Sequence, residues 1–368
     1  MASAASRKVI RILSTICFIN TQLNREFYNI FTQNNKSLAC VFNSSLKSPS
    51  TCYVSSTVMN KQNTMASAAK TFPTNLKDFG YDFDEEGRLR KLDPKTGSLT
   101  NDGFEFNVSE DAQYNQKRYE ALGEVINQYV YELLEKEGLK RLPVPKDSDV
   151  PLEFRSFVFA SDDAFTNKKL MILIHGSGVV RAGQWARRLI INDNIKSGTQ
   201  LPYIKKAKEL GYGIIVLNTN DNRRIINEEN KSIKGSEDPH DHMETVWSQY
   251  IQPSAATDIA IVAHSYGGVC TVEFAHRHRE EFEKRVFAVG FTDSVHRLPR
   301  TGCDHLVKVS KNWVSSEQPL DTPVDCASDD VPCVSAGHPV HEMTSWSCIE
   351  SLFKFLEEHY NNRVKGKD

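Results

Sequence analysis

One short motif in the second half of the chain limits the fold more than any other feature. It is Ile261-Val-Ala-His-Ser-Tyr-Gly-Gly268, which ends an apolar run and precedes a helix-forming segment that starts at Val269. Strand, sharp turn and helix in this order make up the nucleophile elbow, G-x-S-x-G, which exposes a serine hydroxyl on a strained turn. Ala263 replaces the first glycine, which is tolerable because the motif needs small residues where strand and helix approach. The motif predicts Ser265 as a nucleophile; the alternative is an ordinary serine in a glycine-rich turn.

From Phe154 onwards, short apolar runs alternate with amphipathic segments. Apolar runs without strict alternation are typical of strands buried on both faces, and strand–helix alternation predicts a mostly parallel sheet covered by helices. We therefore expect an α/β-hydrolase-type domain over about residues 150–362. The expected strands are Phe154–Ala160, Leu170–Ile174, Gly213–Asn218, Asp258–Ala263, Val286–Phe291, Asn312–Ser316 and Pro332–Ser335. The expected helices are Gln184–Leu210 (broken near Gly198), Met243–Gln252, Val269–Glu283 and Thr344–Tyr360.

The first 64 residues differ in composition from the rest of the chain. They contain one acidic residue, Glu26, against seven lysines and arginines, with many Ser, Thr and Asn. We expect a disordered extension, or an alternative start at Met65, because the peptide Met1-Ala-Ser-Ala-Ala recurs there. A mitochondrial transit peptide is the alternative, since such peptides are basic, Ser-rich and poor in acidic residues.

A small N-terminal element is expected over residues 72–140. Alternating aromatic residues before a turn at Asp84–Gly87 predict a β-hairpin (Phe79, Tyr81, Phe83). Apolar residues at the helical period then predict an amphipathic helix from about Asp111 to Lys136. The prolines that follow indicate a linker to the main domain (Pro143, Pro145, Pro151).

A second glycine-containing loop, His175-Gly-Ser-Gly178, follows the expected strand that ends at Ile174. In this fold such a loop can present a backbone N–H to an oxyanion, together with the N–H of the residue after the nucleophile. The sequence therefore predicts an oxyanion hole formed by Tyr266 with Ser177 and Gly176. The alternative is a phosphate-binding loop, which is disfavoured because the G-x-G-x-x-G spacing and the P-loop lysine are both absent.

The other members of a catalytic triad are expected in the C-terminal third, in the chain order acid, then histidine. His338 and His341 both precede the expected last helix. We expect Asp321 as the acid because it follows the penultimate strand of the main run, with Asp293 and then Asp325 as alternatives. Each of these carboxylates could instead cap a helix or form a turn.

Composition and spacing exclude several other kinds of site. The formal net charge of −2 gives no general attraction to nucleic acid or to anionic membranes, and no apolar run approaches the roughly 20 residues of a membrane span. The C-terminal thiols and imidazoles match no usual zinc-site spacing (Cys326, Cys333, His338, His341, Cys348). We therefore expect no metal, no cofactor, no direct nucleic-acid contact and no membrane association.

Five segments, taken together, carry a resemblance to a known family: Ile174–Asn192, Val262–Gly268, Thr292–His296, Asn312–Ser316 and His341–Trp346. They resemble the argonaute-binding-protein-two (Arb-two) domain family, in particular its animal cotranscriptional-regulator branch. The resemblance covers about residues 72–360.

The resemblance implies an α/β-hydrolase fold with Ser265 as nucleophile, and it favours His341 over His338. It also implies an adaptor that links argonaute with chromatin-remodelling and splicing proteins, in heterochromatin silencing or alternative splicing, located in the cytoplasm and nucleus. An active serine hydrolase using Ser265, His341 and Asp321 is the alternative. The chain departs from the family between Asp221 and Pro239, where relatives often have a Lys-rich insertion that could act as a nuclear-import signal.

Overall fold

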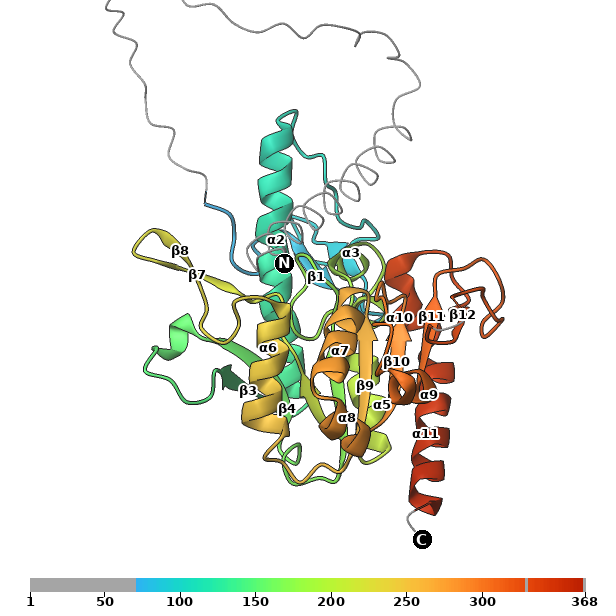
Figure 1. Ribbon diagram of the computed structural model, residues 1–368. Coiled ribbons are helices and arrows are strands. Elements are labelled where there is room, and N and C mark those ends of the chain that lie inside the picture. Colours follow the sequence, from blue (N-terminus) through green and yellow to red (C-terminus); the bar gives the residue numbers. More distant parts are fainter. Residues whose placement is uncertain (1–70, 328–329, 367–368) are drawn as a thin grey trace, which may run out of the picture. The chain divides into compact units, whose positions relative to one another are not determined.

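The computed structural model describes residues 71–327 and 330–366, so the expectations for residues 1–64 lie outside the described residues (Figure 1). An eight-stranded sheet forms its centre. In spatial order its strands are β12 (Cys333–Ser335), β11 (Ser310–Val314), β10 (Val286–Thr292), β9 (Asp258–His264), β5 (Lys169–Ile174), β6 (Gly213–Val216), β4 (Ser156–Ser161) and β3 (Leu139–Val144). The strands from β12 to β6 pair in parallel, and β4 and β3 continue the sheet by antiparallel pairing. This topology confirms the expected mostly parallel sheet.

Helices cover both faces of the sheet, and alternate residues of each strand contact opposite layers. In β5, Met171 and Leu173 contact one layer, whereas Leu170 and Ile172 contact the other. The first layer contains α2 (Ala112–Lys136), α3 (Arg187–Asn192), α5 (Leu201–Glu209) and α11 (Ile349–Lys365). The second contains α6 (Pro239–Val246), α7 (Tyr266–Arg277), α8 (Arg279–Arg285) and α9 (Asp304–Val309). Burial on both faces explains why the strands appear in the sequence as continuous apolar runs.

The N-terminal part of the described chain belongs to the same compact unit as the sheet, which extends from Ala69 to Asp368. The expected hairpin is present as β1 (Tyr81–Phe83) and β2 (Leu89–Lys91). The expected helix α2 begins after Asp111, whose carboxylate accepts hydrogen bonds from the first-turn N–H groups. The buried face of α2 packs in the core layer formed by α3, α5 and α11, so the segment is part of the main fold.

Two further strand pairings differ from the sequence-based expectation. The segment expected to be a linker contains β3, which pairs with β4 along its whole length at the edge of the sheet. Pro143 lies within β3, and an edge strand tolerates proline because one side of it makes no ladder bonds. A projecting hairpin, β7 (Arg223–Ile226) and β8 (Glu229–Ser232), was not expected (Figure 1).

Helix boundaries also differ. The expected helix Gln184–Leu210 is divided into α3, α4 (Ile195–Gly198) and α5, and the Asn194 side chain caps α4. Helix α6 starts at Pro239 and continues into a π-helical turn, η2 (Trp247–Ile251). The last expected helix is preceded by the short turns η3 (His341–Met343) and α10 (Thr344–Ser347). A further short turn, η1 (Leu152–Phe154), precedes β4.

Candidate active site

Ser265 lies between the end of β9 and the first residue of α7, where the expected elbow falls. Its backbone has φ +51° and ψ −119°, a conformation that non-glycine residues rarely adopt and that is associated with functional strain. Two hydrogen bonds hold this turn: the Ser265 N–H donates to Thr292 O at 3.1 Å, and the Gly268 N–H donates to Ser265 O at 3.1 Å. The geometry is that of a nucleophile elbow.

Both glycines after Ser265 are required by close packing. A Cβ atom at Gly267 would lie 2.7 Å from the carbonyl oxygens of Ile174 and His175, and one at Gly268 would lie 1.8 Å from Ser294 Oγ. Helix α7 thus starts in direct contact with the loops that follow β5 and β10. This contact explains why the motif demands small residues on the helical side of the serine.

His341 lies at the start of η3 and faces Asp293, which directly follows β10. Its Nδ1 atom is 2.7 Å from Asp293 Oδ2. The His341 ring centroid is 4.7 Å from that of His264, the residue before Ser265, so the imidazole lies beside the elbow. Arg188 in α3 makes a two-pronged ion pair with Glu342 at 3.1 Å, which ties η3 to the layer that contains α3. The structure therefore brings His341, Asp293 and the elbow together.

Asp293 is held in place by the backbone around it. It has φ +47°, its N–H donates to Trp313 O at 2.8 Å, and its Oδ1 accepts the Ser315 N–H at 3.1 Å. Burial raises the pKa of this carboxyl, but the hydrogen bonds from His341 and Ser315 outweigh burial and hold the pKa below its ordinary value. Asp293 is therefore ionised at neutral pH and can accept a proton-bearing Nδ1.

Asp321, the acid preferred from the sequence, has other partners. Its Oδ1 accepts hydrogen bonds from Trp313 Nε1 at 2.8 Å and from Ser351 Oγ at 2.6 Å, so it connects β11 to α11. The structure therefore replaces Asp321 with the alternative Asp293 as the acid beside His341. The third candidate, Asp325, is exposed on the loop before β12.

His338 is used in its own loop. Its Nδ1 atom accepts the Val340 N–H at 3.0 Å, and its carbonyl oxygen accepts the Ser316 N–H at 3.1 Å. Of the two candidate histidines, the one favoured by the family resemblance is thus the one that faces a carboxylate.

The loop after β5 approaches Ser265 closely. A Cβ atom at Gly176 would lie 3.0 Å from Ser265 Cβ and 3.5 Å from Ser265 Oγ. The next residue, Ser177, is exposed. Tyr266 is the first residue of α7, where backbone N–H groups have no carbonyl partner within the helix. Both expected oxyanion-hole segments are therefore adjacent to Ser265.

Three histidines near the site are buried, and burial keeps them uncharged. Burial lowers the pKa of His175 to about 4 and, with the nearby His341 imidazole adding to the effect, the pKa of His264 to about 3. Burial also lowers the pKa of His242 to about 3. His264 is fixed by Thr292, whose carbonyl oxygen lies 2.9 Å from its Nδ1 atom. These rings are neutral at physiological pH and act as hydrogen-bonding groups of defined orientation.

Sequence reasoning did not single out the loop Asn218-Thr-Asn-Asp-Asn222, which follows β6 at the same edge of the sheet. Asn220 Nδ2 donates to Gly176 O at 2.9 Å and to Val180 O at 3.1 Å, and Asn218 Oδ1 accepts the Ala182 N–H at 2.9 Å. The signal that could have identified it was three asparagines directly after a buried strand.

Pockets, metal-ligand groups and membrane-spanning helices would each be a further sign of function. Two surface pockets of about 730 and 500 Å³ are lined by residues that include Arg285 in the first and Asp241 in the second, and neither is lined by Ser265, His341 or Asp293. No group of three or more His, Cys, Asp or Glu side chains within residues 71–327 and 330–366 is arranged to hold a metal ion. None of the helices described is both long and apolar enough to cross a bilayer.

Comparison with known proteins identifies the family. The Arb2 domain model matches residues 72–320. The chain belongs to the Arb2 domain family.

Several curated relatives match with similar coverage. The human "Cotranscriptional regulator ARB2A" is 42% identical, over 78% of this chain and 81% of that protein. The homologue from Gallus gallus is 43% identical with the same coverage, and the "FAM172 family protein homolog" from Caenorhabditis elegans is 38% identical over 77% of this chain and 87% of that protein.

Among solved structures, the histone deacetylase Clr3 is 15% identical with a TM-score of 0.44, over 71% of this chain and 42% of that chain. A histone deacetylase from Saccharomyces cerevisiae is 17% identical with a TM-score of 0.43, over 65% of this chain and 98% of that chain.

Proposed function

We propose that this Arb2-family protein is a serine hydrolase that acts on an ester, thioester or amide bond, with Ser265, His341 and Asp293 as its catalytic triad. The observation that supports this most is the strained conformation of Ser265 beside a histidine bound to a carboxylate. A strained φ at a non-glycine residue costs roughly 1–3 kcal/mol and persists where the surroundings enforce it. The conformation of Ser265 is held by the close packing of Gly267 and Gly268 on one side and by the approach of Gly176, in the loop after β5, on the other.

The proposed chemistry follows from the hydrogen-bond directions. With the proton on Nδ1 donated to Asp293, the Nε2 atom of His341 is the basic nitrogen that takes the Ser265 hydroxyl proton. The Ser265 oxygen then attacks the acyl carbon, and the N–H groups of Tyr266 and Ser177 stabilise the resulting oxyanion. The protonated His341 returns its proton to the leaving group, and water releases the acyl group by the same steps.

A fluorophosphonate probe tests this proposal, because it phosphonylates activated serines. We expect labelling of the full chain at Ser265, identified by peptide mass mapping, and loss of labelling in Ser265→Ala and His341→Ala. Ser347→Ala is the matched control because Ser347 donates its hydroxyl to Thr344 O and takes no part in the proposed triad. Absence of labelling in the wild-type protein, or labelling that survives Ser265→Ala, would refute the assignment.

We also propose that the protein acts as a cotranscriptional regulator in the nucleus, linking argonaute with chromatin-remodelling or splicing proteins. Support comes from relatives about 42% identical that carry the name cotranscriptional regulator, and from the family resemblance for argonaute. The test is co-precipitation of argonaute from nuclear extract with the wild-type chain and with Ser265→Ala. If argonaute co-precipitates with both proteins, binding does not need the hydrolase site. If argonaute does not co-precipitate with the wild-type chain, the adaptor role is excluded.

A further inference from the structure

The loop between β6 and β7, residues 218–222, binds the main chain of the loop that carries Gly176 and Ser177. Asn220 Nδ2 donates hydrogen bonds to two backbone carbonyls of that loop, those of Gly176 and Val180, and also lies 3.4 Å from His175 Nδ1. The Gly176 carbonyl also lies 2.8 Å from His175 Nδ1, so two nitrogen atoms face it. An amide that spans two carbonyls of a neighbouring loop fixes the orientation of the peptide planes to which they belong.

The strand order indicates which side of the Gly176–Ser177 peptide faces Asn220 and which side faces Ser265. In the sheet, β5 lies between β9, which leads to Ser265, and β6, which leads to Asn220. Gly176, at the end of β5, therefore has Asn220 on one side and the nucleophile on the other, and a Cβ atom at Gly176 would contact Ser265 at 3.0 Å. A trans peptide is planar, so its C=O and the following N–H point in opposite directions. Because the Gly176 C=O accepts from Asn220, we expect the Ser177 N–H to point away from Asn220, towards the side of Ser265.

We infer that Asn220 is a positioning residue that aims the Ser177 N–H into the oxyanion hole. This inference rests on the proposed hydrolase function. Asn220 does not touch the reacting atoms; it acts through the Gly176 carbonyl. A donor fixed before the reaction needs no reorganisation when the negative charge develops, which is the physical basis of oxyanion stabilisation.

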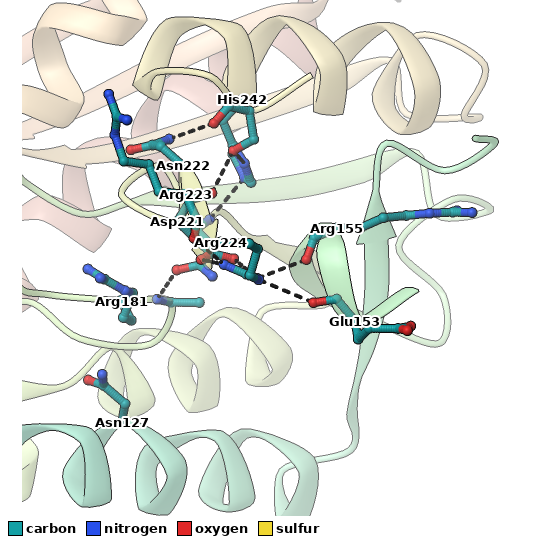
Figure 2. A network of polar contacts seen from close by, with 12 residues as sticks. Asn127, Glu153, Arg155, Arg181, Asp221, Asn222, Arg223, Arg224 and His242 are labelled. Carbon is teal, nitrogen blue, oxygen red and sulfur yellow. Dashed lines mark hydrogen bonds and ion pairs between the residues drawn. The ribbon is translucent and has the colours of Figure 1, made fainter. Parts of the chain in front are cut away.

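The loop that carries Asn220 is held by a polar network that includes Asp221, Asn222 and His242 (Figure 2). The Asp221 carboxylate pairs with the Arg224 guanidinium, one contact being 2.8 Å, and Arg224 also donates to Arg155 O at 2.8 Å. This arrangement fixes the loop to the segment that enters β4. It also connects the loop to β7, on which Arg224 lies.

His242 completes the support from the other layer. Its Nε2 atom accepts the Asn218 N–H at 3.1 Å, so the neutral ring carries its proton on Nδ1, which lies 2.9 Å from Ser236 Oγ. Ser236 in turn donates its hydroxyl proton to Asp221 O at 2.9 Å. The Asn218 N–H, the His242 Nδ1 proton and the Ser236 hydroxyl each have an acceptor in this series, which holds the ring in one tautomer and ties it to the loop.

The decisive experiment compares Asn220→Asp with Asn222→Ala in the full chain. Asp keeps the shape of Asn but cannot donate a hydrogen bond, and its charge repels the Gly176 carbonyl oxygen. Asn222 is the matched control: it lies in the same loop and also donates to two carbonyls, Thr219 O at 2.9 Å and Ser236 O at 3.0 Å, neither in the Gly176 loop. Thermal unfolding of both variants checks that each one folds.

Two readouts are needed. In fluorophosphonate inactivation we expect the limiting rate for Asn220→Asp to fall at least about tenfold. This loss is smaller than the roughly 10²–10³-fold loss caused by deleting an oxyanion donor outright. We expect the probe concentration that gives half of the limiting rate to be unchanged. In crystal structures we expect the Gly176–Ser177 peptide to rotate in Asn220→Asp and to keep its orientation in Asn222→Ala.

The outcomes separate this inference from the proposed function. An unchanged peptide in Asn220→Asp, or an unchanged inactivation rate, overturns the role of Asn220. Equal slowing by Asn222→Ala also overturns it, because general loosening of the loop would then suffice. If the wild-type chain does not react with the probe, the hydrolase proposal fails, and the peptide orientation alone still decides whether Asn220 positions the loop.

Discussion

His341 Nδ1 lies 2.7 Å from Asp293 Oδ2, and these two residues come from loops that follow different elements of the sheet. The pairing places Asp293 directly after β10, one strand away from β9, the strand that leads to Ser265. Asp293 also has both its N–H and its Oδ1 atom bound to the segment 313–315 that ends β11. The orientation of the imidazole therefore depends on the packing of two adjacent parallel strands.

The acid assignment predicts a difference between two aspartates. Asn in place of a triad Asp favours the wrong histidine tautomer and lowers the rate by about 10⁴-fold in a serine protease. We expect Asp293→Asn to slow fluorophosphonate labelling at least 10²-fold on that basis, and Asp321→Asn to leave it within about threefold. Single-turnover labelling followed by in-gel fluorescence measures both rates. Equal loss in the two variants would mean that the acid has not been identified.

Asp321 is predicted to contribute to stability instead. It accepts a hydrogen bond from the indole N–H of Trp313, a fully buried side chain, and removal of the acceptor leaves a buried donor without a partner. Such a donor costs about 1–3 kcal/mol. We expect Asp321→Ala to lower the free energy of unfolding by this amount in urea titrations monitored by tryptophan fluorescence. A change below about 0.5 kcal/mol would contradict the structural role.

The contact between α7 and the Asp293 loop predicts a steric effect at Gly268. An alanine Cβ at this position would overlap Ser294 Oγ, at 1.8 Å, and we expect Gly268→Ala to destabilise the fold by about 1–3 kcal/mol. The double variant Gly268→Ala with Ser294→Gly should recover most of this loss in the same urea titration. If the single variant is neutral, the close approach of helix and loop is absent in solution.

The buried histidines predict a stability loss in mild acid. An unfolded chain protonates histidine near pH 6.5, whereas burial lowers the pKa of His242 and His264 to about 3 and that of His175 to about 4. Below pH 6.5 the unfolded state therefore binds protons that the folded state does not, and the free energy of unfolding falls as pH falls. The slope can reach about 1.4 kcal/mol per pH unit for each histidine.

Urea titrations between pH 7.5 and 5 measure this slope. His242→Gln keeps an acceptor for the Asn218 N–H but does not titrate, so we expect its slope to be shallower by up to one proton equivalent. An unchanged slope would mean that His242 takes up its proton over the same pH range in the folded and the unfolded state, contrary to its lowered pKa.

Much of the site could be predicted from the sequence because its parts lie in short local motifs. The strained turn at Ser265 and the loop at Gly176 each follow an apolar strand, and both sit at the carboxyl edge of the sheet where the fold requires them. The sequence favoured Asp321, whereas Asp293 is the carboxylate that lies beside His341. Both residues follow strands, and only the three-dimensional packing of β10 and β11 determines which carboxylate meets His341. Asp321 turns at φ +66° towards Trp313 and α11 instead.

The missed strands have equally local explanations. Pro143 in β3, followed by Pro145 and Pro151, resembled a linker, although at an edge strand the missing N–H of Pro143 costs no ladder bond. The turn of the β7–β8 hairpin uses Asn227 and Glu228, both with positive φ, rather than the Asn-Gly pair that normally signals such a turn. The three asparagines after β6 mark the loop, but the role inferred for Asn220 depends on its contact with a second loop, which the sequence of the first loop does not show.

Strand β3 covers an edge of β4 that would otherwise be open to pairing with further strands. It covers the free edge of β4 with six backbone pairings, and the α2 helix that leads into it covers part of one sheet face. A truncated protein that begins at residue 150 would expose unpaired N–H and C=O groups along β4 next to an uncovered apolar surface. Exposed edges of this kind recruit further strands, so we expect that fragment to form insoluble aggregates where the longer chain does not.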